Sequence, residues 1–368
     1  MSVSMRRVGI VVLLAMAVLG VAACGGGSGG GDSGGGSGTV PAAVSQRVEN
    51  AKSPVKNWPG PTESIKAPTS KKIVAITCSS QGYGCVQGGI GVQQAGEALG
   101  WDVTVVDGKG DPGVWNSSIQ QAIVTKADGI VLLAINPQLV QGALDKAKTA
   151  DIPVISTFIP KLPGPTVDGY VSTDHVEGGK ILADWIIEDS GGDASVLMLN
   201  EKAFPELVQR NEALVKELKD QCPNCEVADT VQLSIGTMGQ ELAPAVTSAL
   251  QRNPNITHVV APFDSSGILA GQGIRQAGKT GQVKLVSAEG DPNGIRAVQS
   301  GEQAVDLATV PPWGGWAASD LLARQFAGEP VDSEVLPQRL FDESNVPSGE
   351  GWDGDVDYEA EFKKLWGR

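Results

Sequence analysis

The chain has 368 residues, and its 28 basic and 42 acidic side chains give a formal net charge of −14. This charge disfavours nucleic acid as a partner, because phosphates would be repelled. About 300 residues follow the N-terminal region, which is enough for two domains of ordinary size. The composition therefore predicts an acidic protein of about two domains that does not bind nucleic acid.

The N-terminus has the order of features that directs export. Arg6 and Arg7 are followed by an apolar or small stretch over 8–23, which ends in Val21-Ala22-Ala23-Cys24. Charge, apolar core and small residues make a signal peptide, and the stretch is short for a membrane span of about 20 residues. The ending resembles the lipobox of bacterial lipoproteins. We therefore expect residues 1–23 to be a lipoprotein signal peptide and Cys24 to carry a lipid that holds the exported protein at the outer face of the cytoplasmic membrane, in the periplasm or cell-wall space. An ordinary secretory signal is the alternative.

Residues 24–71 are expected to connect the anchor to the folded part. Residues 25–38 are almost entirely Gly and Ser, which cannot bury apolar surface and predict a flexible tether. Residues 39–70 are polar and rich in Pro, which predicts an extended or poorly ordered segment.

Four cysteines remain for an oxidising compartment, and they allow three pairings. Proximity in sequence favours Cys78 with Cys85 and Cys222 with Cys225. The alternative for the second pair is a redox or zinc motif. However, this motif follows a predicted helix rather than opening one, and the chain has only two histidines. We predict structural disulfides, no metal and no cofactor.

From residue 72 onward, apolar runs rich in β-branched residues alternate with amphipathic stretches. The first series predicts strands over 73–76, 103–106, 130–133 and 154–157, with helices over 88–99, 114–126 and 139–150. A second series predicts strands over 195–199, 227–233, 258–261 and 283–288, with helices over 205–219, 238–251 and 265–277. Strands that are apolar throughout and alternate with helices are typical of parallel sheets covered on both faces. Two such series predict two similar α/β lobes with ligand-binding loops at their strand ends.

Two glycine motifs invite a nucleotide-binding interpretation. Residues 273–280 match the P-loop pattern, but they begin inside a predicted helix and lead into a strand, which is the reverse of the required order. Gly278 is better explained as a left-handed helix C-terminus. Residues 88–91 follow a strand, but their glycine spacing is not that of a dinucleotide fold. The sequence shows no catalytic motif, although scattered carboxylates leave an enzyme open as an alternative.

Three segments carry a family resemblance, and they span residues 127–131, 151–155 and 171–179. Together with the lipobox, they resemble the type I, ribose-binding-like solute-binding proteins of bacterial ABC importers, over residues 72–341. The resemblance implies two doubly wound lobes, 72–173 plus 310–337 and 174–309 plus 338–368. It also implies a multi-segment hinge with crossings near 173–174, 308–311 and 336–339.

The family pattern implies a ligand site on loops after the strands of both lobes. The positions that it implies here are Gln81, Tyr83, Asn136, Thr157, Phe158, Phe204, Arg210, Phe263, Asp264, Glu289, Thr309 and Trp313. The chain departs from its sugar-binding relatives where they carry Asp-Arg, because it has Phe158-Ile159. Similarly, Phe263-Asp264 stands where they carry Asn-Asp. Fewer charged groups and more rings put a simple pentose or hexose in doubt.

The resemblance implies the substrate-binding component of an ABC importer, which captures a sugar or sugar-like solute by lobe closure and delivers it to a permease. We expect a monomer that is not an enzyme. The alternatives are binding of a polyol, an aromatic compound or another organic acid, for uptake or for signalling to a membrane receptor. A structural surface lipoprotein is a further alternative.

Overall fold

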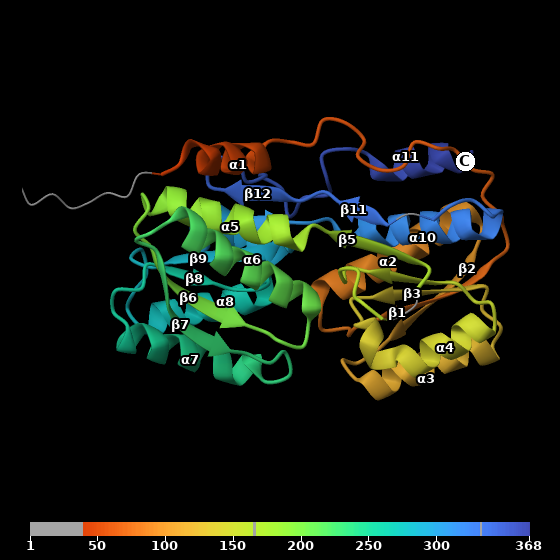
Figure 1. The fold of residues 1–368 in the computed structure, drawn as a ribbon, viewed down its shortest axis with the longest axis horizontal. Coiled ribbons are helices and arrows are strands. Elements are labelled where there is room, and N and C mark those ends of the chain that lie inside the picture. Colours follow the sequence, from red (N-terminus) through yellow and green to blue (C-terminus); the bar gives the residue numbers. More distant parts are fainter. Residues whose placement is uncertain (1–39, 165–166, 332) are drawn as a thin grey trace, which may run out of the picture. The chain divides into compact units, whose positions relative to one another are not determined.

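The computed structural model describes residues 40–164, 167–331 and 333–368, and the predicted signal peptide, Cys24 and tether lie outside them. Within this described part, none of the helices combines the length and apolar character that a membrane crossing requires. Two six-stranded sheets form the framework (Figure 1). The prediction of two α/β lobes is confirmed.

The first lobe is built on a parallel sheet with the strand order β11-β5-β4-β3-β1-β2. Its strands are β1 (Lys72–Thr77), β2 (Asp102–Asp107), β3 (Gly129–Leu133), β4 (Val154–Thr157), β5 (Gly169–Thr173) and β11 (Glu334–Leu336). Its helices are α2 (Tyr83–Leu99), α3 (Pro112–Val124), the short 3-10 helix η1 (Pro137–Val140), α4 (Gln141–Thr149), α10 (Pro311–Ala327) and α11 (Tyr358–Leu365).

The second lobe repeats this plan with the strand order β12-β10-β9-β8-β6-β7. Its strands are β6 (Ser195–Asn200), β7 (Glu226–Gln232), β8 (His258–Val260), β9 (Lys284–Glu289), β10 (Val305–Ala308) and β12 (Arg339–Asp342), which alone of these pairs antiparallel. Its helices are α1 (Ala42–Lys52), α5 (His175–Asp189), α6 (Pro205–Gln221), α7 (Met238–Arg252), α8 (Asp264–Gln276) and α9 (Pro292–Ser300).

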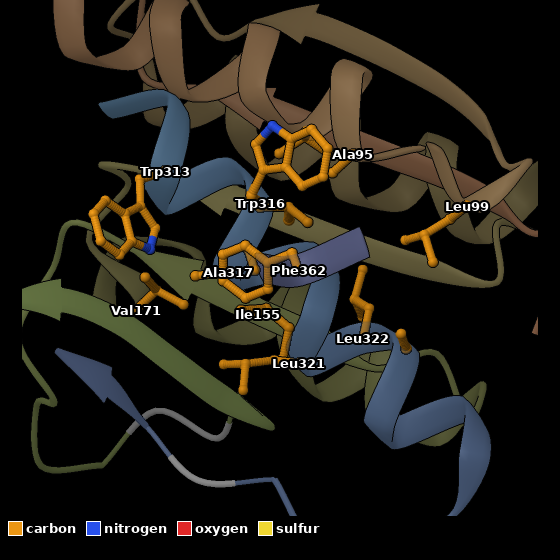
Figure 2. Close-up of a cluster of buried hydrophobic side chains, with 14 of the residues drawn as sticks. Ala95, Leu99, Ile155, Val171, Trp313, Trp316, Ala317, Leu321, Leu322 and Phe362 are labelled. Carbon is orange, nitrogen blue, oxygen red and sulfur yellow. The ribbon is translucent and has the colours of Figure 1, made fainter. Parts of the chain in front are cut away.

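Each sheet separates two hydrophobic cores, because alternate side chains along a strand point to opposite faces. In the first lobe, Val131 and Leu133 pack towards α2, α10 and α11, while Ile130 and Leu132 pack towards α3 and α4. Figure 2 shows the first of these cores, in which Trp316 and Phe362 lie among aliphatic side chains of several elements. Both faces of each sheet are therefore covered, as the unbroken apolar strands predict.

Glycines allow α2 and α10 to pack unusually closely. A Cβ atom on Gly91 would lie 2.1 Å from the backbone oxygen of Pro312, and one on Gly315 would lie 2.3 Å from that of Gly88. No side chain fits at such distances, so the two helices touch through their backbones. The glycines of residues 88–91 thus serve helix packing inside α2, and they do not form a phosphate loop.

The second glycine motif also has a local structural explanation. Gly278 has a φ of +70°, and it follows the last turn of α8. The amide of Lys279 donates to the carbonyl of Ile274 at 3.0 Å, which satisfies a carbonyl of the helix end. This motif ends a helix and contains no helix N-terminus at which phosphate could bind.

The chain passes between the two sheets at the regions that the resemblance indicates. It leaves β5 for α5 at Asp174, leaves β10 for α10 through residues 309–310, and leaves β11 for β12 through residues 337–338. The lobes are also joined by two connections that the sequence analysis did not predict. Each is formed by a segment at one end of the described chain.

The segment 41–69, which we call the strap, crosses from the second lobe to the first. Its helix α1 buries Val44 and Val48 in the core of the second lobe, and farther along Ile65 and Ala67 join the core of the first. The sequence predicted an extended or poorly ordered lead-in here. Residues 53–69 form no helix or strand, as expected, but residues 42–52 form α1 because two valines spaced four residues apart are buried on one side.

The segment 343–368, which we call the tail, returns from β12 to the first lobe. Tyr358, Phe362, Leu365 and Trp366 are buried in the core of that lobe against α10. The sequence analysis assigned residues 338–368 to the second lobe. In the structure, α11 packs on the first lobe instead. The carboxylate of Asp355 joins the two segments, because it accepts from the backbone amide of Val55 at 2.8 Å and pairs with Arg339.

Candidate functional site

A pocket lies where the loops after the strands of both sheets meet. The first lobe contributes Gln81 and Tyr83 from the loop after β1 and the start of α2, and Phe158 from the end of β4. The free space is about 140 Å³, which suits a small molecule. The second lobe and the crossings contribute aromatic, charged and apolar groups: Thr173, His175, Phe204, Glu206, Leu207, Arg210, Ile235, Met238, Phe263, Ser265, Glu289, Asp291 and Thr309. Larger hollows lie on outer surfaces, such as the one beside Trp185, away from the strand ends.

Most of the residues that the sequence indicated for the ligand site line this pocket. They are Gln81, Tyr83, Phe158, Phe204, Arg210, Phe263, Glu289 and Thr309. The pocket therefore brings together side chains from positions 81–309 of the sequence, and both rings and hydrogen-bonding groups line it.

The other four residues lie outside the pocket lining and have structural contacts. The side chain of Asn136 accepts from the amide of Gln138 at the start of η1, and the hydroxyl of Thr157 donates to a strand carbonyl. Asp264 is buried behind the pocket at the start of α8. Trp313 stacks between Trp58 of the strap and Tyr358 of the tail, with ring centroids 5.4 and 5.0 Å away.

Three ionisable residues of the pocket were not among the predicted ligand residues. Glu206 lies in the first turn of α6, and Asp291 caps α9 by accepting from the amide of Gly294 at 2.8 Å. His175 begins α5 at the first crossing. For Glu206 a signal was available, because it precedes Arg210 by four residues on the same helix face. Asp291 has the sequence signal of a helix N-cap followed by a proline.

Three residues that line the pocket have strained backbone conformations. Ala134, Phe158 and Glu289 follow or end strands β3, β4 and β9, and their φ angles are +52°, +66° and +109°. Residues with side chains rarely adopt positive φ, and such residues concentrate at binding sites. At each position the strained turn directs the chain away from the sheet at its carboxyl end, and the residue lines the pocket.

Arg210 is the central cation of the pocket. It is 4% exposed, and its guanidinium donates through Nη2 to the carbonyl of Pro262. Glu289 and Glu206 have the largest effect among the acidic groups that act on the pKa of Arg210. Burial raises the pKa of each of these two carboxyl groups to about 8, and the charge of Arg210 only partly opposes this. The site therefore holds one buried cation beside carboxyl groups that retain protons near neutral pH.

His175 connects the pocket to the hinge without adding charge. Its Nε2 lies 2.9 Å from the hydroxyl of Ser172 and 3.2 Å from the carbonyl of Phe158. Burial, helped by the nearby positive charge of Arg210, lowers the pKa of His175 to about 4. The imidazole is therefore neutral at physiological pH, and it ties the first crossing to the strained turn at Phe158.

The loop that carries Gln81 and Tyr83 is closed by two cysteines. The Sγ atoms of Cys78 and Cys85 lie 2.07 Å apart, and both residues line the pocket. The Sγ atoms of Cys222 and Cys225 are 2.01 Å apart at the end of α6, far along the chain from any pocket-lining residue of that helix. Within the described residues, no cluster of His, Cys, Asp and Glu has the arrangement of a metal site.

The sequence and the fold match a known family. The family described as the periplasmic binding protein domain matches residues 73–330, which is most of the chain. The chain belongs to this family. It is thus a solute-binding protein with the type I fold, and both the strap and the tail lie outside the matched region.

Individual members of the family are similar along most of their length. The ribose import binding protein of Salmonella typhimurium is 27% identical over 248 residues, which cover 66% of this chain and 81% of the relative. The xylitol-binding protein of Mycolicibacterium smegmatis is 24% identical and covers 63% and 70%. A solute-binding protein from Agrobacterium vitis, solved with bound allitol, superposes with a TM-score of 0.69 at 23% identity, covering 76% of this chain and 97% of its own.

Proposed function

We propose that this solute-binding protein is the substrate-binding component of an ABC importer and captures a small sugar or sugar-like solute between its lobes. The observation that carries the proposal is the pocket itself, in which rings of both lobes and charged groups of the second lobe meet at the strand ends. Flat rings stack on the C–H faces of such solutes, and charged groups bind their hydroxyls. Closure of the lobes would complete both sets of contacts.

The named ligands of similar proteins support this class of solute. Relatives are described as binding ribose, allose and xylitol, and similar structures contain allitol, D-arabinose or myo-inositol. These ligands share several vicinal hydroxyls on a chain or ring of five or six carbons. Transport without chemical change is the proposed role, so we do not expect the protein to be an enzyme.

The proposal includes the form in which the protein works. It is an exported monomer whose Cys24 carries a lipid, and a membrane permease receives the solute. The close sulfur pairs Cys78–Cys85 and Cys222–Cys225 are disulfides in that oxidising compartment. The first of them would hold the loop that carries Gln81 and Tyr83 in place before a ligand arrives.

Thermal-shift screening tests this proposal. A ligand that binds only the folded protein, at about 100 times its dissociation constant, adds about 2.7 kcal/mol to stability. We expect one or more pentoses, hexoses, polyols or their close derivatives to raise the melting temperature, and mass spectrometry to recover the ligand unchanged. Absence of any stabilising compound in such a panel would contradict the proposal, and turnover of a compound would indicate an enzyme.

A further inference from the structure

Glu206 is a carboxylate in the pocket that lacks a partner of its own. It is 8% exposed, and its Oε2 forms no hydrogen bond to any described residue. Arg210 lies one turn farther along α6, but its guanidinium donates to the carbonyl of Pro262, and no ion pair between these two side chains occurs within 4 Å in the described chain. A buried carboxylate is costly unless it is paired, so an unpartnered one at a binding pocket indicates a group supplied by the ligand.

The acidic residues that line the pocket outnumber the basic ones. Glu206, Glu289 and Asp291 line it, whereas Arg210 is the only Lys or Arg among the described lining residues. His175 adds no positive charge, because its pKa is lowered to about 4. A ligand with a carboxylate would therefore meet three carboxyl groups and a guanidinium that is already engaged. This charge balance disfavours the organic acids that the sequence left open.

The walls of the pocket suit a cation as well. Tyr83, Phe158, Phe204 and Phe263 line it, and three of these rings remain partly exposed. The face of an aromatic ring attracts an ammonium group, and the attraction is stronger where water is excluded. Rings and a free carboxylate together make an ammonium site, while Arg210 and Glu289 remain available for hydroxyls.

We propose that the solute carries a protonated amine beside its hydroxyls, as an amino sugar or an amino polyol does, and that Glu206 binds this ammonium group. This proposal rests on the proposed function, since it assigns a chemical class to the ligand of the same pocket. The ammonium pairs with the ionised form of Glu206, and its N–H groups donate to the oxygens of that carboxylate.

A matched set of compounds separates charge from shape. D-glucamine, D-sorbitol and D-gluconate share one hydroxylated carbon chain and end in an ammonium, a hydroxymethyl and a carboxylate group, and the ribitol series provides the same three ends on five carbons. Titration calorimetry at pH 7.5 should give the order amine, then neutral polyol, then acid in at least one series. The Glu206→Gln variant should bind the amine roughly 10- to 100-fold more weakly, the effect of losing a hydrogen bond to a charged group.

The same variant should change little else. Its affinity for the neutral polyol should fall much less than its affinity for the amine, because only the amine loses a charged partner. Glu212→Gln is the matched control, since it makes the same substitution on the exposed face of α6 and should leave all affinities unchanged.

The pH dependence gives an independent readout. The charged groups that act on Glu206 are Arg210 and Glu201. Glu289 and Asp264 act in turn on Arg210. Burial raises the pKa of Glu206 to about 8, so the amine must displace a proton from it near neutral pH. Amine affinity should therefore rise between pH 6.5 and 8.5 in the native protein and not in Glu206→Gln.

The outcomes separate this inference from the function beneath it. Tightest binding of a neutral polyol or sugar, or of the acid, with no change of preference in Glu206→Gln, would overturn the amine and leave the solute-binding role intact. If no compound of either series and none of the wider sugar panel bound, both proposals would be overturned.

Discussion

Several carboxyl groups of the second lobe keep their protons to unusually high pH. Burial raises the pKa of Asp184 and Asp264 to about 7, and that of Glu206 and Glu289 to about 8. Desolvation is the largest cause at each group. Arg47 of the strap opposes it at Asp184, where the two side chains form an ion pair. These single residues couple the stability of the whole protein to pH.

We predict that the ligand-free protein loses stability as the pH rises from 6 to 8.5. The folded-state pKa of each of these acids lies above its value in the unfolded chain, so the stabilisation is complete at acidic pH and disappears as the pH passes through about 7 to 8. His175 acts in the opposite direction, but its contribution is complete above pH 6.5. Urea unfolding should show a loss on the order of 1–3 kcal/mol, and constant or rising stability over this range would contradict the assignment.

The elements of the fold were predictable where hydrophobic periodicity alone forms them. Strand β4 coincides with its prediction, β1 and β2 extend theirs by one residue at each end, and α7 extends its own by one residue at the C-terminal end. Helix α2 begins at Tyr83, five residues before its prediction, because the chain turns into the helix directly after the loop closed by Cys78 and Cys85. Helices at the two ends of the described chain, such as α1 and α11, were missed because their apolar residues are few and are buried only by contact with distant segments.

The ligand site was predictable only in part, for a related reason. Positions at or directly after strand ends, such as Glu289 and Phe158, could be placed because parallel strands bring their ends together. The position of the Trp313 ring could not be predicted, because the ring stacks against Trp58 and Tyr358, which come from the strap and the tail. The side chain of Asn136 instead caps η1. Such a local contact competes with ligand binding wherever an Asn follows a strand.

The pairing of α2 with α10 gives a prediction for a single methyl group. Gly91→Ala places a Cβ atom 2.1 Å from the backbone of Pro312, so the two helices must separate. We expect a loss of about 1–3 kcal/mol or more in the free energy of unfolding, the usual effect of overpacking a core. Gly142→Ala is the control, since a Cβ there meets nothing within 4 Å, and the exchange should be neutral or slightly stabilising. Equal effects of the two substitutions in urea unfolding would refute the close packing.

At the scale of the whole molecule, the strap and the tail join the lobes outside the region shared with the family. Lys52, at the end of α1, pairs with Asp342 at 2.7 Å, and its carbonyl accepts from Asn345 at 3.2 Å. Farther along, the amide of Ile65 donates to the carbonyl of Leu365 in α11 at 2.9 Å. The strap thus contacts the second lobe at one end and the tail, on the first lobe, at the other.

A single substitution at Asp355 should remove contacts that join the strap and the tail. Its carboxylate accepts from Val55 of the strap and Trp352 of the tail and pairs with Arg339 of β12. We expect Asp355→Ala to lower the free energy of unfolding by about 1.5–3 kcal/mol, because a buried guanidinium and an amide lose their acceptor. Asp353→Ala, at an exposed position of the same tail, should cost less than about 0.5 kcal/mol. Guanidinium titrations that show equal midpoints for the two variants would contradict this role.

The aromatic stack between strap and tail also gives the protein an internal optical reporter. The rings of Trp58 and Trp313 are nearly parallel with centroids 5.4 Å apart, and those of Trp316 and Trp366 repeat this arrangement. Indoles this close interact electronically, whereas none of the described residues that line the pocket is a tryptophan. A change in tryptophan emission when solute is added would therefore come from rearrangement around the indoles rather than from contact of an indole ring with the solute.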